Sequence, residues 1–534
     1  MKNNLGLSWR AYLTYLFLLI GFFALIIRIF AIQYIDGEFL ASKGKKMLET
    51  SRIVPALRGS IFDRNNFPLA VSINQYDLYA LKNLTEDDFN KLKNIIILNR
   101  DYLDIKQENK KLLIFSNLDF SQFEKINQLR LSGIEIETFQ KRYYPLSEQV
   151  APLVGFAGMD GVGLEGLENI LDSELSGFAG KETIFKNASR RPISTEEAVQ
   201  GKDITLTIDS RIQFYTYKHL SRFVEANNAK GGSAIILDNL SGEILAIASY
   251  PSYNPNSPQR SIKRNRALVD AFEPGSIIKP LVLAKGIDLG VVTNNEIIDT
   301  SPGFINLNGR KFSDPKNYKN LTLKEIIAKS SQVGASKLAL LVGIEGLIAG
   351  YKGFGLSKPP NLFFPNIAYG VINSRKDISD SEIASLGFGY SMTASSLQLA
   401  QAYSVFANDG YLKDFKIFID DAELYKQRVI SQTAARDVLD SLQLVVTEGT
   451  GKLAKLSHYQ VAGKTGTSHK SSSKGGYDQS KYIASFAGIA PLKSKRLTIF
   501  VSVEEPGLNN YSGGSVAAPL FAAISKDVLN YLDE

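Results

Sequence analysis

Ser276 and Lys279 are residues whose types and spacing could carry out chemistry. They stand three positions apart in FEPGSIIKPL, so on a helix both side chains lie on one face and can meet. A serine hydroxyl is a weak nucleophile that needs an adjacent base, and lysine can serve when burial or a nearby cation lowers its pKa. Pro274 and Gly275 predict a turn into a helix N-terminus, where free backbone N–H groups favour developing negative charge. The pair indicates nucleophilic acyl transfer.

The Ser-x-x-Lys pattern alone is weak evidence, because it also begins at Ser42, Ser313 and Ser471. Two later segments single out the pair at 276. KSSQVGASK and GKTGT supply, in that order, Ser330 and Gln332, then Lys464, Thr465, Gly466 and Thr467. Lys-Thr-Gly occurs only once in the chain. A nucleophile–base pair, a second hydroxyl and a strand-like Lys-Thr-Gly are the parts of the Ser-x-x-Lys serine acyltransferases.

A Ser-His-Asp hydrolase is the rival chemistry. The chain has three histidines, His219, His458 and His469, and the last directly follows the Lys-Thr-Gly-Thr segment. No G-x-S-x-G nucleophile elbow supports this alternative. The absence of cysteine excludes a thiolate nucleophile, and three histidines do not suggest a histidine-rich metal site. We therefore expect no metal and no cofactor.

Residues 11–35 form an apolar run that predicts a membrane anchor. The run has 25 residues with one charge, Arg28, and about 20 apolar residues suffice to cross a bilayer as a helix. A cleaved signal peptide is the closest alternative, but its apolar region is normally about 7–15 residues long. Residues 1–10 then form a cytoplasmic tail. The basic residues on the two sides of the run do not favour that orientation; it rests on function alone.

Two regions follow the anchor. Residues 36–202 alternate short apolar strands with polar helical stretches and predict a non-catalytic α+β module. From 203 the pattern predicts a strand over 203–209, a helix over 210–229, and two strands within 232–256 joined by an Asn-Leu-Ser-Gly turn. Residues 468–481 have the composition of a loop. The net charge of +7 includes no basic block with interleaved aromatics, so nucleic-acid binding is not expected.

These motifs resemble the class B penicillin-binding proteins of the FtsI type, the septal transpeptidases. RNRALVDAFEPGSIIKP and KSSQVGASKLAL carry the likeness, and FEPGS is more like the division enzymes than the elongation enzymes, which tend to have Pro-Pro-Gly-Ser. The likeness continues in RGSIFDRNNFPLA (58–70), RYYP (142–145), GLEGLEN (163–169), GFGYSMTASSLQLAQAYSVFANDG (387–410) and KYIASFAGIAP (481–491). It therefore covers most of the chain.

The resemblance implies an α+β multidomain fold: an N-terminal transmembrane helix, a β-rich pedestal of the dimerisation type over 36–202, and a transpeptidase domain over 203–534. The last would hold a five-stranded antiparallel sheet flanked by helices. It also implies a single-pass protein of the bacterial cytoplasmic membrane, with its catalytic domain on the periplasmic side. An FtsW-type glycosyltransferase and other division proteins would be its partners.

The resemblance further implies a serine-type D-Ala-D-Ala transpeptidase or carboxypeptidase. Ser276 would attack the stem peptide of peptidoglycan, Lys279 would take its proton, Ser330 would relay a proton to the leaving amine, and Lys464 would set the local electrostatics. Thr465 and Thr467 would bind the substrate carboxylate beside Gly466, and the backbone N–H groups of Ser276 and Thr467 would form the oxyanion hole. An amine of a second stem peptide would resolve the acyl-enzyme, and β-lactams would stall at Ser276.

Gln332 departs from the family pattern, which usually has asparagine in Ser-x-Asn. Glutamine keeps the amide donor and acceptor but adds a methylene group, so we expect retained activity with altered substrate or β-lactam affinity. Two alternatives stay open: an elongation-type class B transpeptidase, and a non-catalytic divisome scaffold. A bifunctional glycosyltransferase–transpeptidase would need a further catalytic domain, for which the region before 203 offers no motif, and a β-lactamase rarely carries an anchor and a large preceding domain.

Overall fold

The computed structural model describes residues 9–108, 110–185, 192–257, 264–293, 295–373, 375, 377–421, 425–472, 475–493, 497–507 and 510–533. The described residues form two compact units. One contains the chain up to Leu57 together with Gly177–Gly201, and the other contains Arg58–Ser176 and the chain from Lys202 onward. Of the tail expected at 1–10, residues 1–8 lie outside the described part.

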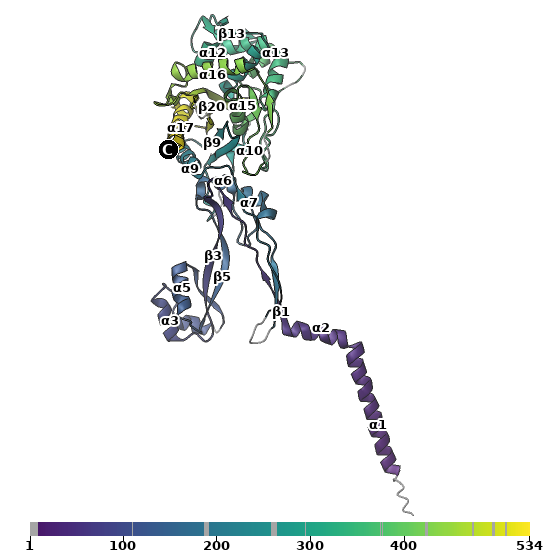
Figure 1. Cartoon of the computed structure of the whole chain (residues 1–534). Helices are drawn as coiled ribbons and strands as arrows, with labels where there is room; N and C mark the ends of the chain where they lie inside the picture. Colours follow the sequence, from purple (N-terminus) through teal and green to yellow (C-terminus); the bar gives the residue numbers. More distant parts are fainter. Residues whose placement is uncertain are drawn as a thin grey trace, which may run out of the picture. The chain divides into compact units, whose positions relative to one another are not determined.

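The first unit contains the apolar helix. Helix α1 (Trp9–Phe30) continues through a π-helical turn, η1 (Ala31–Ile35), and the 27 residues bury no side chain (Figure 1). At about 1.5 Å per residue this length exceeds the roughly 30 Å of a bilayer core. Helix α2 (Gly37–Leu48) follows, and then a three-stranded sheet of β1 (Glu49–Val54), β6 (Gly180–Phe185) and β7 (Pro192–Glu196).

The second unit begins with a strand-rich module. Strands β2 (Ile61–Phe62), β3 (Pro68–Ala80), β4 (Leu112–Leu118), β5 (Ile134–Tyr143) and β8 (Ile204–Thr205) share one sheet. Helices α3 (Glu86–Lys93), α4 (Tyr102–Gln107) and α5 (Phe120–Gln128) accompany them. Short helical turns η2 (Ser147–Gln149), α6 (Ala151–Val154), α7 (Gly166–Ile170) and α8 (Asp172–Leu175) come next.

A buried ion cluster brings together three of the motifs that lie outside the catalytic region. Glu168, which is fully buried, accepts from Arg58 Nε at 2.7 Å and from Arg142 Nε at 2.6 Å. Arg58 Nη1 also donates to Asp172 Oδ1 at 2.6 Å. These arginines belong to RGSIF and RYYP, and the glutamate belongs to GLEGLEN. Buried charges need such partners. The ion pairs therefore hold the three motifs against one another in the folded chain.

The C-terminal part of the chain is built on an antiparallel sheet in the order β10–β9–β21–β20–β19. Its strands are β9 (Gly231–Asp238), β10 (Glu243–Tyr250), β19 (Ala462–Ser471), β20 (Tyr477–Ala490) and β21 (Leu497–Glu504). Successive side chains point to opposite faces. Ala234 and Ile236 therefore pack with α9 (Ser210–Ala226) and α17 (Ala518–Asp533), and Ile235 and Leu237 with the core around α15 (Ser396–Ala407). The five-stranded sheet flanked by helices is confirmed.

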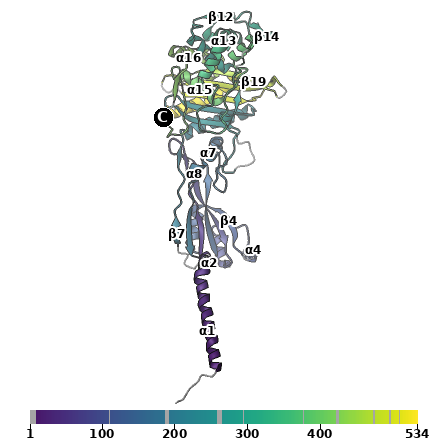
Figure 2. The same cartoon turned by 90° about the vertical axis from the view of Figure 1, so that its right-hand side faces the viewer.

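A helical layer lies beside this sheet, with α13 and α16 together in both views (Figures 1 and 2). It contains α11 (Lys279–Asp288), α12 (Leu323–Lys329), α13 (Gln332–Gly353), α14 (Asp380–Gly387) and α16 (Gln432–Thr447). The short elements are α10 (Arg266–Val269), β11 (Ala271–Phe272), η3 (Gly275–Ile278), β12 (Ile297–Asp299), β13 (Phe304–Leu307), β14 (Arg310–Ser313), β15 (Asn320–Thr322), β16 (Ala394–Ser395), β17 (Tyr411–Lys413), β18 (Lys426–Arg428), η4 (Lys452–Ala454) and η5 (Gly513–Ala517).

Two local expectations are wrong in part. The stretch 468–481 is mostly strand, because β19 runs to Ser471 and β20 begins at Tyr477; sheet pairing overrides its polar, loop-like composition. Conversely, the strand expected over 203–209 is reduced to Ile204–Thr205. The helix over 210–229 and the paired strands around the Asn-Leu-Ser-Gly turn are confirmed.

Candidate active site

Ser276 lies in the 3₁₀ turn η3, which leads directly into α11. Gly275 enters this turn with φ 57°, a left-handed conformation that suits glycine. The buried hydroxyl of Tyr403, in α15, donates to Ile277 O at 2.8 Å and so holds the turn in place. A Cβ at Gly275 would lie 3.0 Å from Thr467 O, so the turn packs directly against β19. Ser276 itself is partly exposed, which is compatible with the role of nucleophile predicted for it.

Lys279, Ser330 and Lys464 meet at one hydroxyl. Lys279 Nζ lies 3.2 Å from Ser330 Oγ and donates to Ser330 O at 2.6 Å. Lys464 Nζ lies 3.0 Å from the same Oγ. Lys279 is 1% exposed and Lys464 is fully buried. The hydroxyl has one hydrogen and two lone pairs, so it can accept from one lysine and donate to the other when that lysine is neutral.

Burial lowers the pKa of both lysines. Desolvation brings the pKa of Lys279 to about 7, against a smaller opposing effect of the Asp314 carboxylate. Desolvation, with the nearby charge of Lys279, holds the pKa of Lys464 well below its usual range. Two ammonium groups on one buried hydroxyl repel each other, so the pair holds fewer than two protons at neutral pH. Such a pair can act as a base.

Asp314 positions the turn that carries Ser330. Ser330 ends α12 in a left-handed conformation, with φ 56° and ψ 37°. The nearly buried carboxylate of Asp314 accepts from Ser331 Oγ at 2.6 Å, from Gln332 N at 2.5 Å and from Val333 N at 3.2 Å. It therefore binds the start of α13 as a helix N-cap does. Ser330, with its left-handed backbone, is therefore held in the short turn between α12 and α13.

Gln332 is the first residue of α13, two positions after Ser330, and its side chain is partly exposed. Its backbone N–H is fixed by Asp314, and its carbonyl accepts from Ser336 Oγ at 2.8 Å. Backbone placement therefore does not depend on whether the side chain is glutamine or asparagine. The extra methylene group of glutamine therefore moves the side-chain amide farther from the backbone and leaves the conformation of the turn unchanged.

Strand β19 presents the Lys-Thr-Gly-Thr segment at the edge of the sheet. Thr465 Oγ1 lies 3.3 Å from Lys464 Nζ, and Thr467 Oγ1 accepts from Gly513 N at 2.9 Å. A Cβ at Gly466 would lie 2.4 Å from Ser485 Oγ and 2.6 Å from Ile277, in the turn that carries Ser276. Glycine is therefore required at 466 for the strand and the Ser276 turn to approach each other.

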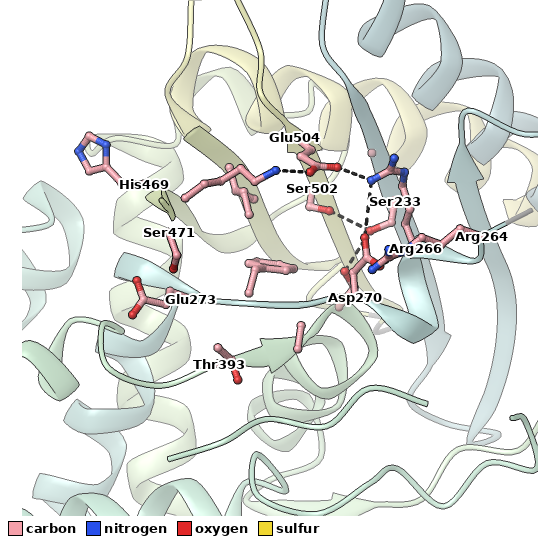
Figure 3. A pocket seen from close by; sticks show the side chains of 16 residues that line it. Ser233, Arg264, Arg266, Asp270, Glu273, Thr393, His469, Ser471, Ser502 and Glu504 are labelled. Atoms are coloured by element: carbon pink, nitrogen blue, oxygen red, sulfur yellow. Dashed lines mark hydrogen bonds and ion pairs between the residues drawn. The ribbon is translucent and has the colours of Figure 1, made fainter. Parts of the chain in front are cut away.

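A cavity of about 310 Å³ lies beyond Thr467, near the end of β19 (Figure 3). Glu504 joins Arg266, which lies in the segment leading to Ser276, and also Lys470 of β19. The residues lining this cavity are distinct from the predicted catalytic set. Its ion pairs tie the far end of β19 to β21 and to α10.

The structure brings Lys279, Ser330, Lys464 and Thr465 into one hydrogen-bonded group. Gly466 and Thr467 continue the strand that packs on the Ser276 turn, and Gln332 stands at the end of the Ser330 turn. The rival histidine, His469, packs its ring 4.6 Å from that of Tyr482, and its Nδ1 has no hydrogen-bond partner within the described residues. It therefore lacks the carboxylate partner of a Ser-His-Asp triad.

Sequence reasoning assigned no role to Asp314, Tyr403 and Gly513, which position the predicted residues. Tyr403 lies in the family-like segment 387–410, whereas Asp314 and Gly513 lie outside the segments that carry the resemblance. Asp314 stands inside SDPK, beside the serine of a chance Ser-x-x-Lys match. Neither its residue type nor its spacing signals contact with a turn 16 residues later. Only the hairpin of β13 and β14 brings it there.

Comparisons with known proteins identify two related domains in this chain. The model of the penicillin-binding protein transpeptidase domain matches residues 232–526, and that of the penicillin-binding protein dimerisation domain matches residues 53–206. The peptidoglycan D,D-transpeptidase FtsI of Escherichia coli K12 is 33% identical, over 99% of this chain and 92% of the relative. The protein of the same name from Buchnera aphidicola subsp. Schizaphis graminum is 34% identical, over 99% of this chain and 96% of the relative.

Solved structures extend the likeness. Penicillin-binding protein 3 of Mycobacterium tuberculosis, complexed with aztreonam, has a TM-score of 0.71 at 26% identity, over 90% of this chain and 97% of that chain. The transpeptidase domain of penicillin-binding protein 3 from Burkholderia pseudomallei has a TM-score of 0.57 at 39% identity, over 61% of this chain and 96% of that chain.

A serine–lysine pair, a second hydroxyl and a Lys-Thr-Gly strand on this sheet, together with the matched transpeptidase domain, define a serine penicillin-binding transpeptidase. Two further findings separate the class B enzymes from other serine penicillin-binding transpeptidases: the dimerisation domain that precedes the transpeptidase domain, and the relatives that match nearly the whole chain. The chain belongs to the class B penicillin-binding proteins and is a peptidoglycan D,D-transpeptidase.

Proposed function

We propose that this transpeptidase cross-links peptidoglycan stem peptides during septal wall synthesis, through an acyl-enzyme on Ser276. The observation that carries the site assignment is the hydroxyl of Ser330 shared by two buried lysines, 3.2 Å from Lys279 Nζ and 3.0 Å from Lys464 Nζ. This arrangement supplies a neutral base next to the nucleophile turn and a hydroxyl that moves protons between the two amines.

In the first half-reaction Ser276 Oγ attacks the carbonyl of the penultimate D-alanine, and Lys279 takes its proton. The proton passes through Ser330 to the nitrogen of the terminal D-alanine as the C–N bond breaks. In the second, an amine of another stem peptide attacks the ester, forms the new amide, and returns a proton to Ser276 Oγ. Each half-reaction passes through an oxyanion.

Oxyanion stabilisation is assigned to the backbone N–H groups of Ser276 and Thr467. Support comes from the packing of the nucleophile turn on β19, where Gly275 lies within contact of Thr467. In other acyl-transfer enzymes one such donor contributes about 3–4 kcal/mol to the transition state. Thr465, Gly466 and Thr467 then bind the substrate carboxylate, and Gln332 binds its amide.

We assign residues 1–10 to a cytoplasmic tail, 11–35 to the transmembrane anchor, 36–202 to the non-catalytic module and 203–534 to the periplasmic transpeptidase domain. The 27-residue apolar helix and the limits of the two matched family models support this division. An FtsW-type glycosyltransferase and other division proteins are the proposed partners, since the E. coli relative bears the FtsI name.

Covalent labelling with a fluorescent penicillin tests the site. Wild-type protein and Ser42→Ala, which removes a serine of the same Ser-x-x-Lys spacing at an exposed position, are expected to label equally. Ser276→Ala is expected to lose the label while keeping its circular dichroism spectrum. Equal labelling of Ser276→Ala, or none of a folded wild type, contradicts the assignment; the second result would favour the non-catalytic scaffold.

Localisation of a fluorescent fusion in growing cells tests the septal role. A band at mid-cell is expected. A lateral-wall pattern would instead assign the protein to elongation, with the same chemistry at a different cellular site.

A further inference from the structure

Thr450 is an exposed residue on the loop that follows α16. Its Oγ1 lies 2.8 Å from Thr465 Oγ1, directly behind the Lys-Thr-Gly strand. Its backbone N–H donates to Ala328 O at 3.1 Å, in the helix that ends at Ser330. The loop is therefore hydrogen-bonded both to the Lys-Thr-Gly strand and to the helix that presents the shared hydroxyl.

Thr450 ends a continuous chain of hydrogen-bonding groups. From Lys279 Nζ the steps are 3.2 Å to Ser330 Oγ, 3.0 Å to Lys464 Nζ, 3.3 Å to Thr465 Oγ1 and 2.8 Å to Thr450 Oγ1. Both lysines and Thr465 are buried and Ser330 is partly exposed, whereas Thr450 faces solvent. The chain thus leads from the base to the surface.

Each member of this chain can pass a proton on. A hydroxyl donates one hydrogen and accepts through two lone pairs, so Ser330, Thr465 and Thr450 can receive a proton on one side and release one on the other. A neutral lysine amine accepts, and an ammonium donates. The lowered pKa values of the two lysines keep both forms accessible near neutral pH.

Transpeptidation needs such a route because each half-reaction exchanges one proton with solvent. Acylation moves the Ser276 proton to the leaving nitrogen and forms a neutral amine, which takes a second proton to become an ammonium ion. The acceptor arrives as an ammonium ion and must lose one proton before its lone pair attacks the ester. Its second proton returns to Ser276 Oγ.

We propose that Thr450 is the solvent end of a proton relay through Thr465, Lys464 and Ser330 to Lys279, which supplies a proton after acylation and removes one before aminolysis. This inference rests on the roles proposed above for these lysines and Ser330. Thr450 acts through its neighbours and is a positioning and relay residue, not one that touches the substrate.

β-Lactam acylation separates the relay from the rest of the site. Opening the lactam ring transfers the Ser276 proton to the ring nitrogen, so no proton is exchanged with solvent. Loss of the Thr450 hydroxyl should therefore slow peptide turnover and leave penicillin acylation unchanged. A purely structural role would affect both reactions.

The experiment compares full-length wild type, Thr450→Val, Thr450→Ser and the control Thr447→Val in detergent. Thr447 is exposed on the last turn of α16, and among the described residues its hydroxyl bonds only to carbonyls of its own helix, Gln443 O and Leu444 O, at 3.3 and 3.5 Å. Two rates are measured for each: D-alanine release from a D-alanyl-D-alanine peptide with a free-amine acceptor, and acylation by fluorescent penicillin, resolved into dissociation constant and acylation rate.

Positioned proton transfer contributes about 10²–10⁴-fold, and water can replace part of it, so Thr450→Val is expected to lower peptide turnover by about ten-fold. Its penicillin acylation should match wild type, and Thr450→Ser should restore turnover. Equal losses in both reactions, a weaker penicillin dissociation constant, or unchanged peptide turnover in Thr450→Val overturns the relay. Failure of the wild type to label at Ser276 would instead refute the site itself.

Discussion

Replacing Asp314 with asparagine removes one negative charge from the turn that carries Ser330. The carboxylate accepts from Ser331 Oγ, Gln332 N and Val333 N at 2.6, 2.5 and 3.2 Å, and it is 9% exposed. Hydrogen bonds to a charged group contribute about 1.5–3 kcal/mol each, against about 1 kcal/mol for neutral ones. Asparagine has nearly the same shape, so the effect reports charge rather than a cavity.

The magnitude follows from these three bonds. A loss of roughly 0.5–2 kcal/mol at each of the three bonds gives about 1.5–6 kcal/mol for the turn, and we take about 2 kcal/mol, near the lower end. If the acylation transition state feels all of it, the acylation rate falls roughly 30-fold, since about 1.36 kcal/mol is tenfold. Because the Asp314 charge also raises the pKa of Lys279, its removal lets that lysine lose its proton at lower pH.

The assay is the rate of acylation by fluorescent penicillin, measured from about pH 5 to pH 9. In wild type the rate should rise through the Lys279 pKa of about 7, because only the neutral amine is a base. In Asp314→Asn the plateau should be lower and the rise should occur at lower pH. Asp299→Asn is the control, because this exposed aspartate accepts from Ser301 N rather than from the turn that carries Ser330. A rise that stays in place or moves to higher pH would refute the reasoning.

Three further outcomes are expected. Glu168→Gln should lower the free energy of unfolding by about 3–5 kcal/mol in denaturant titration, because it removes the charge that the buried Arg142 pairs with at 2.6 Å and leaves Arg58 with Asp172 only; a loss below about 1 kcal/mol would contradict this. Gly466→Ala should slow penicillin acylation about 10²-fold, since the new Cβ displaces the nucleophile turn; wild-type kinetics would exclude that contact. Gln332→Asn should change the penicillin dissociation constant about five-fold, the effect of one hydrogen bond, and leave the acylation rate near wild type; a rate change alone would place Gln332 in the chemistry.

The class of site was predictable from short-range rules and motif order. Ser276 and Lys279 stand three apart, so any helical turn brings them to one face, and the order of Ser330 and Lys464 restricted the chemistry to one family of reactions. The strands around the Asn-Leu-Ser-Gly turn were readable because their apolar runs end at a strong turn signal. The strand over 468–471 could not be predicted in this way. Its polar residues are held in a strand by pairing with β20, and local composition carries no information on such pairing.

The amino-acid sequence by itself determined the residue types, their order along the chain and the apolar helix at the N-terminus. Only the tertiary structure decided which of these side chains are hydrogen-bonded to one another. The Ser330 hydroxyl lies 134 positions from Lys464, and their 3.0 Å contact arises where the end of α12 packs beside β19. Burial at that contact, rather than any motif, lowers the pKa of both lysines. Asp314 and Thr450 acquire their roles in the same way, because desolvation and hydrogen bonding depend on neighbours in space.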